Sequence, residues 1–495
     1  MNIVIIGAGT AGLIAALMLR EKYPVATITI VKSGAIGTIG VGEGSTEHWD
    51  SFMRFVGIDH LELLQETRST IKIGILFKNW SSGSDYVHSI SDFALSPLNT
   101  PEQFNHLYLN SEDRQFPLSP FFEHIYSHNN VHLTPEFRPS NQYHFDTFKL
   151  AEYLMKKNID RGAVVIDTIV NNIILDSNGN IQELITSDSD NITGDLFIDC
   201  SGFRRVLSNK LGVKWVSKTD YLPLNRAIAF PTNLDNPDSI EPYTTSTALS
   251  AGWSWKIPTQ DRYGNGYVFN TNFMDSDNAL SEINQLLGKN VEECARDIPF
   301  EAGKVDKFWF KNCISVGLAG SFAEPLEAQS IGFTIVQIFT LIEYLDTWQH
   351  NKNISEKFNT EMDNVFSNVV DYLQLHYMGD RTDTEFWKAK PFLLTDFNKE
   401  NIPLFKRGIF SPIMFQKDFM FQIPNFYQVA AGLKLINKES LLANLAQNRQ
   451  TYNLRYYNDS VAIWKNSKSQ PVVSHSAFIK ICNFNYLNRK KLNES

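Results

Sequence analysis

Three glycines near the N-terminus are spaced in a way that can serve ligand binding. Gly7, Gly9 and Gly12 stand in GAGTAG (7–12), directly after the β-branched run 2–6. A strand, a glycine turn, a helix and a second strand in this order form a dinucleotide-binding unit. Its turn approaches a pyrophosphate, and the helix N-terminus supplies N–H groups and partial positive charge. The motif predicts a dinucleotide site made by Gly7, Ala8, Gly9, Thr10, Ala11 and Gly12.

The end of the second predicted strand departs from this pattern. Dinucleotide-binding units usually carry an Asp or Glu there for the ribose hydroxyls, but this chain has Lys32. Another group could meet the adenosine, or Lys32 could favour a phosphate. Lys32 could equally be a solvated lysine at a strand end. The sequence leaves these interpretations open.

Two later segments also run from an apolar strand into small residues. They are DLFIDCSG (195–202) and KNCISVGLAG (311–320). Three strand ends could therefore meet at one extended cofactor. Because no second motif of the GxGxxG type is visible for a nicotinamide nucleotide, we predict one large dinucleotide, FAD, with electrons from an outside source.

Four further side chains could do chemistry but also have structural interpretations. Lys72 lies in IKIGILF (71–77), whose alternation predicts a strand with one solvated face. Trp253 and Trp255 could simply pack in the core. Glu327 precedes a predicted helix, where a first-turn carboxylate interacts favourably with the helix dipole. Pattern alone favours the structural interpretation for Lys72 and for the tryptophans.

Composition and charge argue against several classes of protein. Of the 495 residues, 43% are hydrophobic and 20% are charged, which is typical of a globular protein. The net charge of −9 argues against nucleic-acid binding. The four cysteines form neither a disulfide framework nor a metal-ligand pattern, so we expect a cytoplasmic protein and no metal site. The apolar run 3–19 contains the three glycines and is followed by charged residues, which favours a buried strand and helix over a membrane span.

The elements that would position these residues follow from hydrophobic periodicity. We predict strands over 2–6, 26–31, 181–187 and 195–198, strand material over 162–174 and 304–317, and helices over 13–22, 143–156 and 330–348. Beyond residue 349 the apolar positions recur mostly at helical spacing, and the polar last dozen residues are expected to be frayed.

The predicted fold class is an α/β, FAD-binding flavoprotein with a Rossmann-type βαβ unit, as in monooxygenases, and a mostly helical C-terminal region. We expect an FAD-binding domain with interleaved substrate-side segments over 1–345. The helical region over 346–495 is expected to complete the substrate pocket.

Eight segments in a fixed order resemble the flavin-dependent halogenases of the tryptophan-halogenase type. They are IVIIGAGTAG (3–12), VGEGS (41–45), IKIGILFKNW (71–80), YHFD (143–146), DLFIDCSGFR (195–204), GWSWKIP (252–258), FWFKNCISVGLAGSFAEPLEAQSIG (308–332) and LHYMGDRTDTEFW (375–387). GWSWKIP is the specific W-x-W-x-I-P signature of that family, whereas GAGTAG is shared with related flavoproteins. The resemblance spans roughly residues 1–390.

The resemblance implies two catalytic residues. Lys72 matches the family's catalytic lysine, whose ammonium could hydrogen-bond hypohalous acid or whose free amine could form a haloamine. A partly buried lysine can have its pKa lowered enough for either role. Glu327 matches the second catalytic residue, whose carboxylate could polarise the halogen donor or stabilise and deprotonate the cationic ring. Glu324 is expected to be structural.

The resemblance also implies a halide site, cofactor contacts and a tunnel. Backbone N–H groups of Gln329 and Ser330 would hold the halide at a helix N-terminus. Further flavin contacts are implied for Glu43, Gly317 and Ile331, although Glu43 could also be a plain turn residue. The tunnel and substrate side would be lined by Trp253, Trp255, Ile257, Pro258 and His88. A lone loop histidine such as His88 is, however, more often an ordinary one.

The implied reaction is halogenation of a small electron-rich aromatic substrate. A separate flavin reductase would supply FADH2, which with O2 and a halide ion would give hypohalous acid for Lys72 to deliver. The alternatives are a flavin monooxygenase that hydroxylates an aromatic substrate and a catalytically inactive flavin-binding relative. No nucleic-acid or membrane partner is expected, and a homo-oligomer stays open.

Two departures from the family pattern bear on selectivity. The family reads Ser-Thr-Gly-Ile or Ala-Thr-Ser-Ile after the glutamate, whereas this chain reads Ala-Gln-Ser-Ile (328–331). A loosened halide site would favour bromide or iodide over chloride. Ile90 replaces a family phenylalanine near the indole, which favours a roomier pocket and tolerance of several phenols or indoles. Free tryptophan is therefore not assured as the substrate.

Overall fold

The structure of the chain is a computed structural model. It describes residues 1–34, 42–82, 84–89, 101–110, 128–133, 138–188, 191–348, 350–351, 353–411, 415, 419–447, 458, 462 and 471–494. The predictions that concern Ile90 lie outside these residues.

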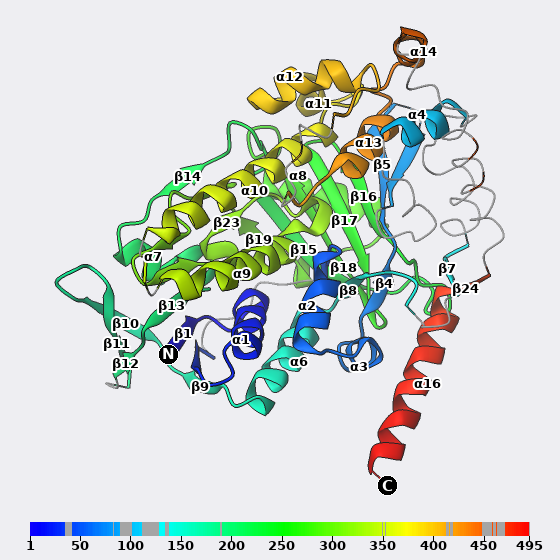
Figure 1. The fold of residues 1–495 in the computed structure, drawn as a ribbon. Coiled ribbons are helices and arrows are strands. Elements are labelled where there is room, and N and C mark those ends of the chain that lie inside the picture. Colours follow the sequence, from blue (N-terminus) through cyan, green and yellow to red (C-terminus); the bar gives the residue numbers. More distant parts are fainter. Residues whose placement is uncertain are drawn as a thin grey trace.

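A six-stranded sheet carries the N-terminal glycine motif (Figure 1). Its order is β21-β22-β13-β1-β2-β9, and every pair except β21–β22 is parallel. The strands are β1 (Asn2–Ile6), β2 (Thr27–Lys32), β9 (Val164–Asp167), β13 (Leu196–Asp199), β21 (Trp309–Phe310) and β22 (Cys313–Ser315). The predicted α/β class and its βαβ unit are therefore confirmed. In such a sheet, ligands bind beyond the carboxyl ends of the strands.

Side-chain alternation along β1 explains how the sheet is covered on both faces. Ile3 and Ile5 pack into the main core with α1 (Thr10–Lys22), which begins inside the glycine motif and contacts α6 and α9. Val4 and Ile6 point to the opposite face and pack against residues of a small antiparallel sheet. That sheet consists of β10 (Val170–Leu175), β11 (Ile181–Thr186) and β12 (Asn191–Thr193).

A second, seven-stranded sheet carries the W-x-W-x-I-P segment. Its order is β19-β15-β18-β17-β16-β5-β6, and only β16 and β5 pair in parallel. The strands are β5 (Ile75–Ser81), β6 (Ser84–His88), β15 (Arg226–Asn233), β16 (Thr244–Leu249), β17 (Gly252–Pro258), β18 (Arg262–Phe269) and β19 (Arg296–Pro299). β17 lies in the middle of this sheet, so its side chains are held from both sides.

The alternating segment 71–77 is divided between two sheets rather than forming one strand. β4 (Thr70–Lys72) pairs with β8 (Gln142–Phe145), which also pairs with β3 (Glu43–Gly44). The chain then turns at Ile73 and Gly74 and enters β5 of the larger sheet. Lys72 is buried with 2% of its surface exposed, so the expectation of a solvated face is wrong.

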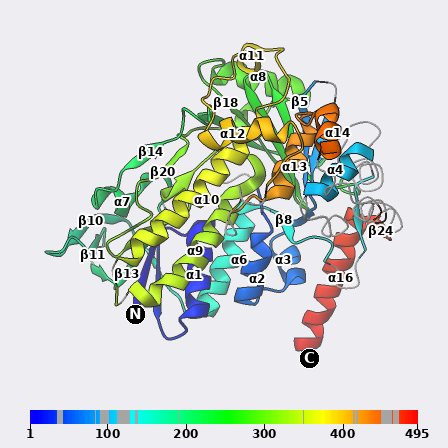
Figure 2. The same ribbon diagram turned by 45° about the horizontal axis from the view of Figure 1, so that its top comes forward.

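Helices cover the sheets and make up most of the chain after residue 349 (Figures 1 and 2). The α-helices besides α1 are α2 (His48–Val56), α3 (His60–Glu66), α4 (Pro101–Asn110), α6 (Thr147–Asp160), α7 (Val206–Lys210), α8 (Ser276–Leu287), α9 (Gln329–Trp348), α10 (Ile354–His376), α11 (Glu385–Ala389), α12 (Asp396–Phe405), α13 (Ile423–Gly432), α14 (Lys438–Gln447) and α16 (His475–Glu494). The 3₁₀ helices are η2 (Gly202–Arg204), η3 (Glu292–Cys294), η4 (Gly317–Ala319) and η5 (Leu326–Ala328). The remaining strands are β7 (Asn130–His132), β14 (Trp215–Ser217), β20 (Gly303–Val305), β23 (Ser321–Phe322) and β24 (Val472–Ser474).

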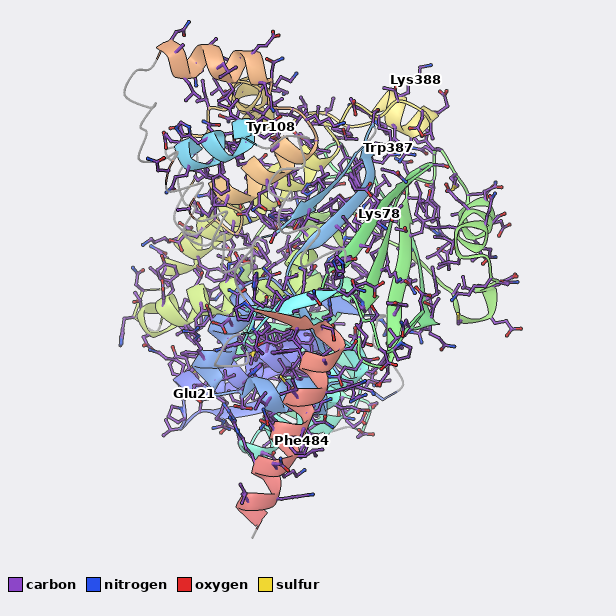
Figure 3. The ribbon with its side chains drawn as sticks, turned by 90° about the vertical axis from the view of Figure 1, so that its right-hand side faces the viewer. Glu21, Lys78, Tyr108, Trp387, Lys388 and Phe484 are labelled. Carbon is purple, nitrogen blue, oxygen red and sulfur yellow. The ribbon has the colours of Figure 1, made fainter. Side chains whose placement is uncertain are left out.

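Two predicted boundaries are wrong for identifiable reasons. The helix expected over 143–156 begins only at Thr147, because Asp146 caps it by accepting from the N–H groups of Phe148 and Lys149 at 3.0 and 3.2 Å. The residues before Asp146 form β8. The C-terminal residues, expected to be frayed, belong to α16, which continues to Glu494. α16 extends away from the body, and Phe484 on it is 65% exposed (Figures 1 and 3).

One stretch of the described residues, Leu326–Trp348, is long and apolar enough to cross a membrane by length and composition. It combines η5 with α9. Most of its residues are buried in the protein, and α9 contacts α1, α2 and α10. Burial on this scale is typical of a core helix.

Candidate active site

A cavity of about 990 Å³ lies beyond the carboxyl end of β1. Many of the sequence-predicted site residues line it, namely Gly7, Ala8, Gly9, Thr10, Ala11, Glu43, Trp253, Trp255, Ile257, Gly317, Glu327, Ser330 and Ile331. They come from the turn between β1 and α1, from β3 and β17, and from the 3₁₀ helices and the start of α9 that follow β22. Gly12, Gln329 and Pro258 are not among the lining residues.

The glycines of the N-terminal motif leave room for a cofactor. A Cβ atom at Gly7, where φ is +110°, would lie 2.2 Å from the carbonyl oxygen of Cys200. At Gly12 it would lie 2.1 Å from the carbonyl oxygen of Gly7, so this residue serves the close packing of the turn. At Gly9 a Cβ atom would meet nothing within 4 Å, because that side faces the cavity.

An acidic residue missing from the end of β2 is present on the neighbouring strand. Lys32 pairs in register with Asp167 on β9, and its Nζ lies 3.2 Å from the Asp167 carboxylate. The same carboxylate accepts from the N–H of Gly34 at 2.9 Å, which lowers the pKa of Asp167. Lys32 and Gly34 line the cavity. Lys32 is therefore an ion-paired lysine at the cavity rim rather than an isolated one.

Buried polar atoms without a protein partner cluster around this cavity. They include Glu43 Oε2, Trp255 Nε1 and Ser246 Oγ, each from a residue that lines it. Burial raises the pKa of Glu43 to about 7, opposed by a hydrogen bond with Thr10. Because buried polar groups are nearly always hydrogen-bonded, these atoms indicate a polar ligand. Together with the glycine cradle and the helix N-terminus of α1, the residues fit an FAD.

β17 forms an aromatic wall of the cavity. Trp253, Trp255 and Ile257 are two residues apart, so their side chains lie on one face of the strand, and all three line the cavity. The two indole rings are 6.1 Å apart and tilted. Pro258 points to the other face of the strand and does not line the cavity. The expectation that it would form part of the wall is therefore wrong. The Pro258 carbonyl oxygen instead accepts from Thr70 Oγ1 at 2.6 Å, which ties β17 to β4.

The segment before α9 has an unusual backbone. Glu327 and Ala328 both have positive φ, 66° and 56°, a conformation that costs about 1–3 kcal/mol for a residue other than glycine. α9 then begins at Gln329, and the first N–H groups of a helix have no intrahelical partner. Ser330 lines the cavity, whereas the side chain of Gln329 is buried and donates to the carbonyl oxygen of Glu324 at 3.3 Å.

Lys72 lies in a second, much smaller cavity of about 10 Å³, lined by Thr46, Lys72, Gly74, Ile75, His88, Gln142 and Glu327. This volume suits one water-sized molecule. The Lys72 ammonium donates to the carbonyl oxygen of Ser45 at 2.8 Å. Burial lowers the pKa of Lys72 to about 8, against the opposing effects of the Glu327 and Glu47 carboxylates.

The two cavities adjoin each other. Ile75 and Glu327 line both of them. Gly44 lines the larger cavity, and a Cβ atom there would lie 3.1 Å from Ala328 Cβ and 3.6 Å from Lys72 Nζ. A glycine at this position therefore keeps space open between the larger cavity and the lysine.

Three side chains make hydrogen bonds with the Glu327 carboxylate. His88 Nδ1 lies 2.8 Å from both carboxylate oxygens, and His376 Nε2 lies 2.9 Å from Oε1. The Tyr372 hydroxyl is 3.3 Å from Oε1. Burial would raise the pKa of Glu327, but His88 and His376 outweigh it and hold this pKa far below its usual range. Glu327 is therefore a carboxylate at neutral pH.

Glu324 has the opposite protonation state. Its side chain is buried, and Oε2 accepts from the Tyr377 hydroxyl at 2.6 Å. Burial raises the pKa of Glu324 to about 8, although hydrogen bonds with Tyr377 and Trp253 oppose this shift. The two neighbouring glutamates thus differ in charge at neutral pH.

The structure places His88, a predicted tunnel or substrate residue, at the end of β6 and bonded to Glu327 rather than in an ordinary loop. Three further residues of the site were missed from the sequence. Tyr372 and His376 on α10, and Asn425 on α13, surround the same carboxylate and histidine. His376 belongs to the LHYMGDRTDTEFW segment (375–387), so its position in a shared motif was the available signal.

Comparison with known proteins identifies the family. The sequence model described as "Tryptophan halogenase" matches residues 2–447. The chain is 30% identical over 479 residues to tryptophan 7-halogenase RebH of Lentzea aerocolonigenes, covering 88% of this chain and 90% of the relative. It is 31% identical over 438 residues to tryptophan 6-halogenase ThaL of Streptomyces albogriseolus, covering 82% of each.

Solved structures agree with this result. BrvH, a flavin-dependent halogenase from Brevundimonas sp. BAL3, superimposes with a TM-score of 0.81 at 26% identity, over 97% of this chain and 99% of that chain. Flavin-dependent halogenases use FADH2 and a halide, and they work with a separate flavin reductase and an aromatic substrate. The comparisons support halogenation and not the hydroxylating alternative. This chain belongs to the tryptophan halogenase family of flavin-dependent enzymes.

Proposed function

We propose that this enzyme forms hypohalous acid in the larger cavity and transfers the halogen to an electron-rich aromatic ring beside Lys72. The observation that carries the proposal is the pair of adjoining cavities, one that fits FAD and one that holds a buried lysine. In the net transfer, hypohalous acid and an aromatic C–H give an aromatic C–halogen bond and water. The O–halogen bond and the C–H bond break, and the ring proton and the hydroxide leave as water.

The residues of the larger cavity would bind the cofactor and the halide. Bound FADH2 would supply, with O2, the two-electron oxidation of the halide. Gly7, Gly9 and the start of α1 would hold the pyrophosphate, and Glu43 would meet the cofactor through its unpartnered oxygen. The first N–H groups of α9, at Gln329 and Ser330, would hold the halide. The wall of Trp253, Trp255 and Ile257 would keep the aromatic substrate out of this cavity.

Lys72 would hold the oxidised halogen as an ammonium. One of its three N–H bonds already points to the carbonyl oxygen of Ser45, which leaves two for the small cavity. A pKa of about 8 keeps the group mostly protonated at pH 7. Hydrogen bonding to the oxygen of hypohalous acid would make the halogen more electrophilic. The Glu327 carboxylate, which lines the same cavity, would stabilise the cationic ring.

The ammonium form predicts a specific pH dependence. Halogenation at saturating substrate and halide should fall as the pH rises through about 8, the pKa of Lys72, because deprotonation removes the donor. Initial rates should be measured between about pH 6.5 and 9.5, with excess reductase so that electron supply is not limiting. A rate that rises through this range would instead indicate a haloamine route through the free amine.

The remaining assignments concern partners and location. We propose that electrons come from a separate reductase and that the enzyme is cytoplasmic, with its four cysteines as free thiols. Residues 346–495 would complete the substrate pocket, since Tyr372, His376 and Asn425 already approach Glu327 and His88. No group of His, Cys, Asp and Glu that could hold a metal occurs among the described residues.

The substrate class is an indole or a phenol. The relatives named tryptophan halogenases make free tryptophan the first compound to test. Gln329 and Ser330 replace the usual small pair at the halide site, which favours larger halides. Larger halides are also oxidised and dehydrated more easily. We therefore expect several indoles or phenols to be accepted, with chloride as the poorest halide.

A single panel of reactions tests this function. Purified enzyme, FAD, NADH, an unrelated flavin reductase and O2 are combined with each aromatic compound and with equal concentrations of chloride, bromide and iodide. Mass spectrometry should find halogenated products, with none when the reductase or the halide is left out. Hydroxylated products would indicate a monooxygenase. Clean monochlorination of free tryptophan that outpaces bromination would contradict the expected selectivity.

A further inference from the structure

The two histidines on Glu327 differ in their hydrogen-bonding surroundings. His88 Nε2 faces the side-chain amide nitrogen of Asn425 at 3.3 Å. The orientation of that amide is fixed, because its oxygen accepts from the N–H of Gln422 at 2.6 Å. The amide nitrogen therefore donates, so His88 Nε2 accepts and His88 Nδ1 carries the hydrogen that points to Glu327. His88 is thus a neutral donor.

His376 is placed between two groups that accept. Its Nδ1 lies 3.1 Å from the backbone carbonyl oxygen of Tyr372, which can only accept. Its Nε2 lies 2.9 Å from Glu327 Oε1. Both Glu327 oxygens are 2.8 Å from the His88 N–H, which requires them to accept and therefore favours the carboxylate. With a carboxylate on one side and a carbonyl on the other, both nitrogens of His376 must donate, so His376 is an imidazolium.

We propose that His376 is a positioning residue whose imidazolium keeps Glu327 ionised and oriented, while neutral His88 holds the same carboxylate without adding charge. The inference rests on the proposed role of Glu327 in halogenation. Glu327 and His88 line the small cavity and His376 does not. The ion pair is therefore a fixed dipole whose negative end faces Lys72 and whose positive end is buried in α10. Such a dipole can stabilise a cationic ring without any rearrangement.

Without this imidazolium, the effect of burial on the Glu327 carboxylate would be opposed less strongly. Burial is the largest influence on the pKa of Glu327 and raises it, whereas His88 and His376 lower it. The other groups that face the pair are His88 and Tyr86 on β6, Tyr372 on α10, Lys72 on β4 and Glu47 before α2. Lys72 opposes protonation of Glu327 but itself loses its proton near pH 8. His376 is thus needed to keep Glu327 ionised across the neutral pH range.

The test is the pH profile of His376→Gln, a side chain that can donate to Glu327 but carries no charge. In the wild type, protonation of Glu327 should not lower the activity between about pH 6 and 8. In the variant, activity should fall as the pH falls, by about tenfold per pH unit once the pH is below the raised pKa of Glu327. Asp371→Asn is the matched control, since Asp371 is a buried acid on the same helix. It should leave the shape of the profile unchanged. Circular dichroism and flavin binding check that each variant is folded.

A double-mutant cycle shows whether His376 acts through Glu327. The variant Glu327→Gln/His376→Gln should be no slower than Glu327→Gln alone. If Glu327→Gln itself halogenates at the wild-type rate, the proposed role of Glu327 fails and the inference fails with it. If Glu327→Gln is slow but His376→Gln keeps the wild-type pH profile, with or without a uniform loss of rate, only the inference about His376 is overturned.

Discussion

Replacement of Lys72 by alanine is expected to abolish halogenation, while flavin binding and the oxidation of reduced flavin by O2 continue. Lys72 lines the smaller cavity and not the larger one, so its removal should not disturb the residues that fit FAD. The loss should exceed about 100-fold, the usual scale for a positioned acid–base group. Product is measured by mass spectrometry, and oxidation of reduced flavin by absorbance in the same reaction.

Two further variants separate chemistry from packing. Lys72→Met fills most of the buried volume without a charge and should be as inactive as the alanine variant. Lys78→Ala removes an exposed lysine on β5, six residues further along the chain (Figure 3), and should retain full activity. Halogenation by Lys72→Ala at close to the wild-type rate would mean that the halogen is delivered by another route.

Replacement of Glu327 by glutamine should lower the rate of halogenation by about 100-fold or more at pH 7. This substitution removes a negative charge, because His88 and His376 keep the pKa of Glu327 low and the side chain is ionised. The amide nitrogen of glutamine is itself a donor, and it would face His88 or His376, which now donate to the Glu327 carboxylate oxygens. Rates are measured at saturating halide and substrate, so that the effect on turnover is separated from binding.

Glu324→Gln provides the matched control. Both glutamates are buried and only three residues apart. The pKa of Glu324 is raised to about 8, so its side chain is a neutral acid at pH 7 and glutamine is a close substitute. This variant should lose less than about tenfold in rate. Equal effects of the two substitutions would show that the charge of Glu327 is not what matters.

The cofactor side of the fold could be predicted well from the sequence. The glycine spacing in 7–12 requires a tight turn between β1 and α1, and local chain geometry is enough to build it. The place of Trp253, Trp255 and Ile257 in the cavity wall follows instead from the family signature, which wrongly adds Pro258 because side chains alternate along a strand. These features depend on residues close together in the chain, so their pattern carries the structural information.

The surroundings of the catalytic residues could not be predicted in the same way. Lys72 occupies a polar position in an alternating segment, which predicts exposure, but β8 and the chain around Ser45 cover it from far away in the sequence. His376 reaches Glu327 from 49 residues away. Asp167 faces Lys32 only because β9 pairs with β2. Such contacts depend on tertiary packing, which sequence periodicity does not contain.

The central claim is that the halogen passes inside the protein from the flavin cavity to Lys72. It is tested most directly by competition between the aromatic substrate and free methionine, whose thioether is oxidised by hypohalous acid in solution. With pre-reduced flavin, bromide, O2 and excess methionine, the wild type is predicted to brominate its substrate undiminished, whereas Lys72→Ala should yield methionine sulfoxide instead. Suppression of the brominated product by methionine in the wild type would show that the halogen travels through solution and would contradict the account.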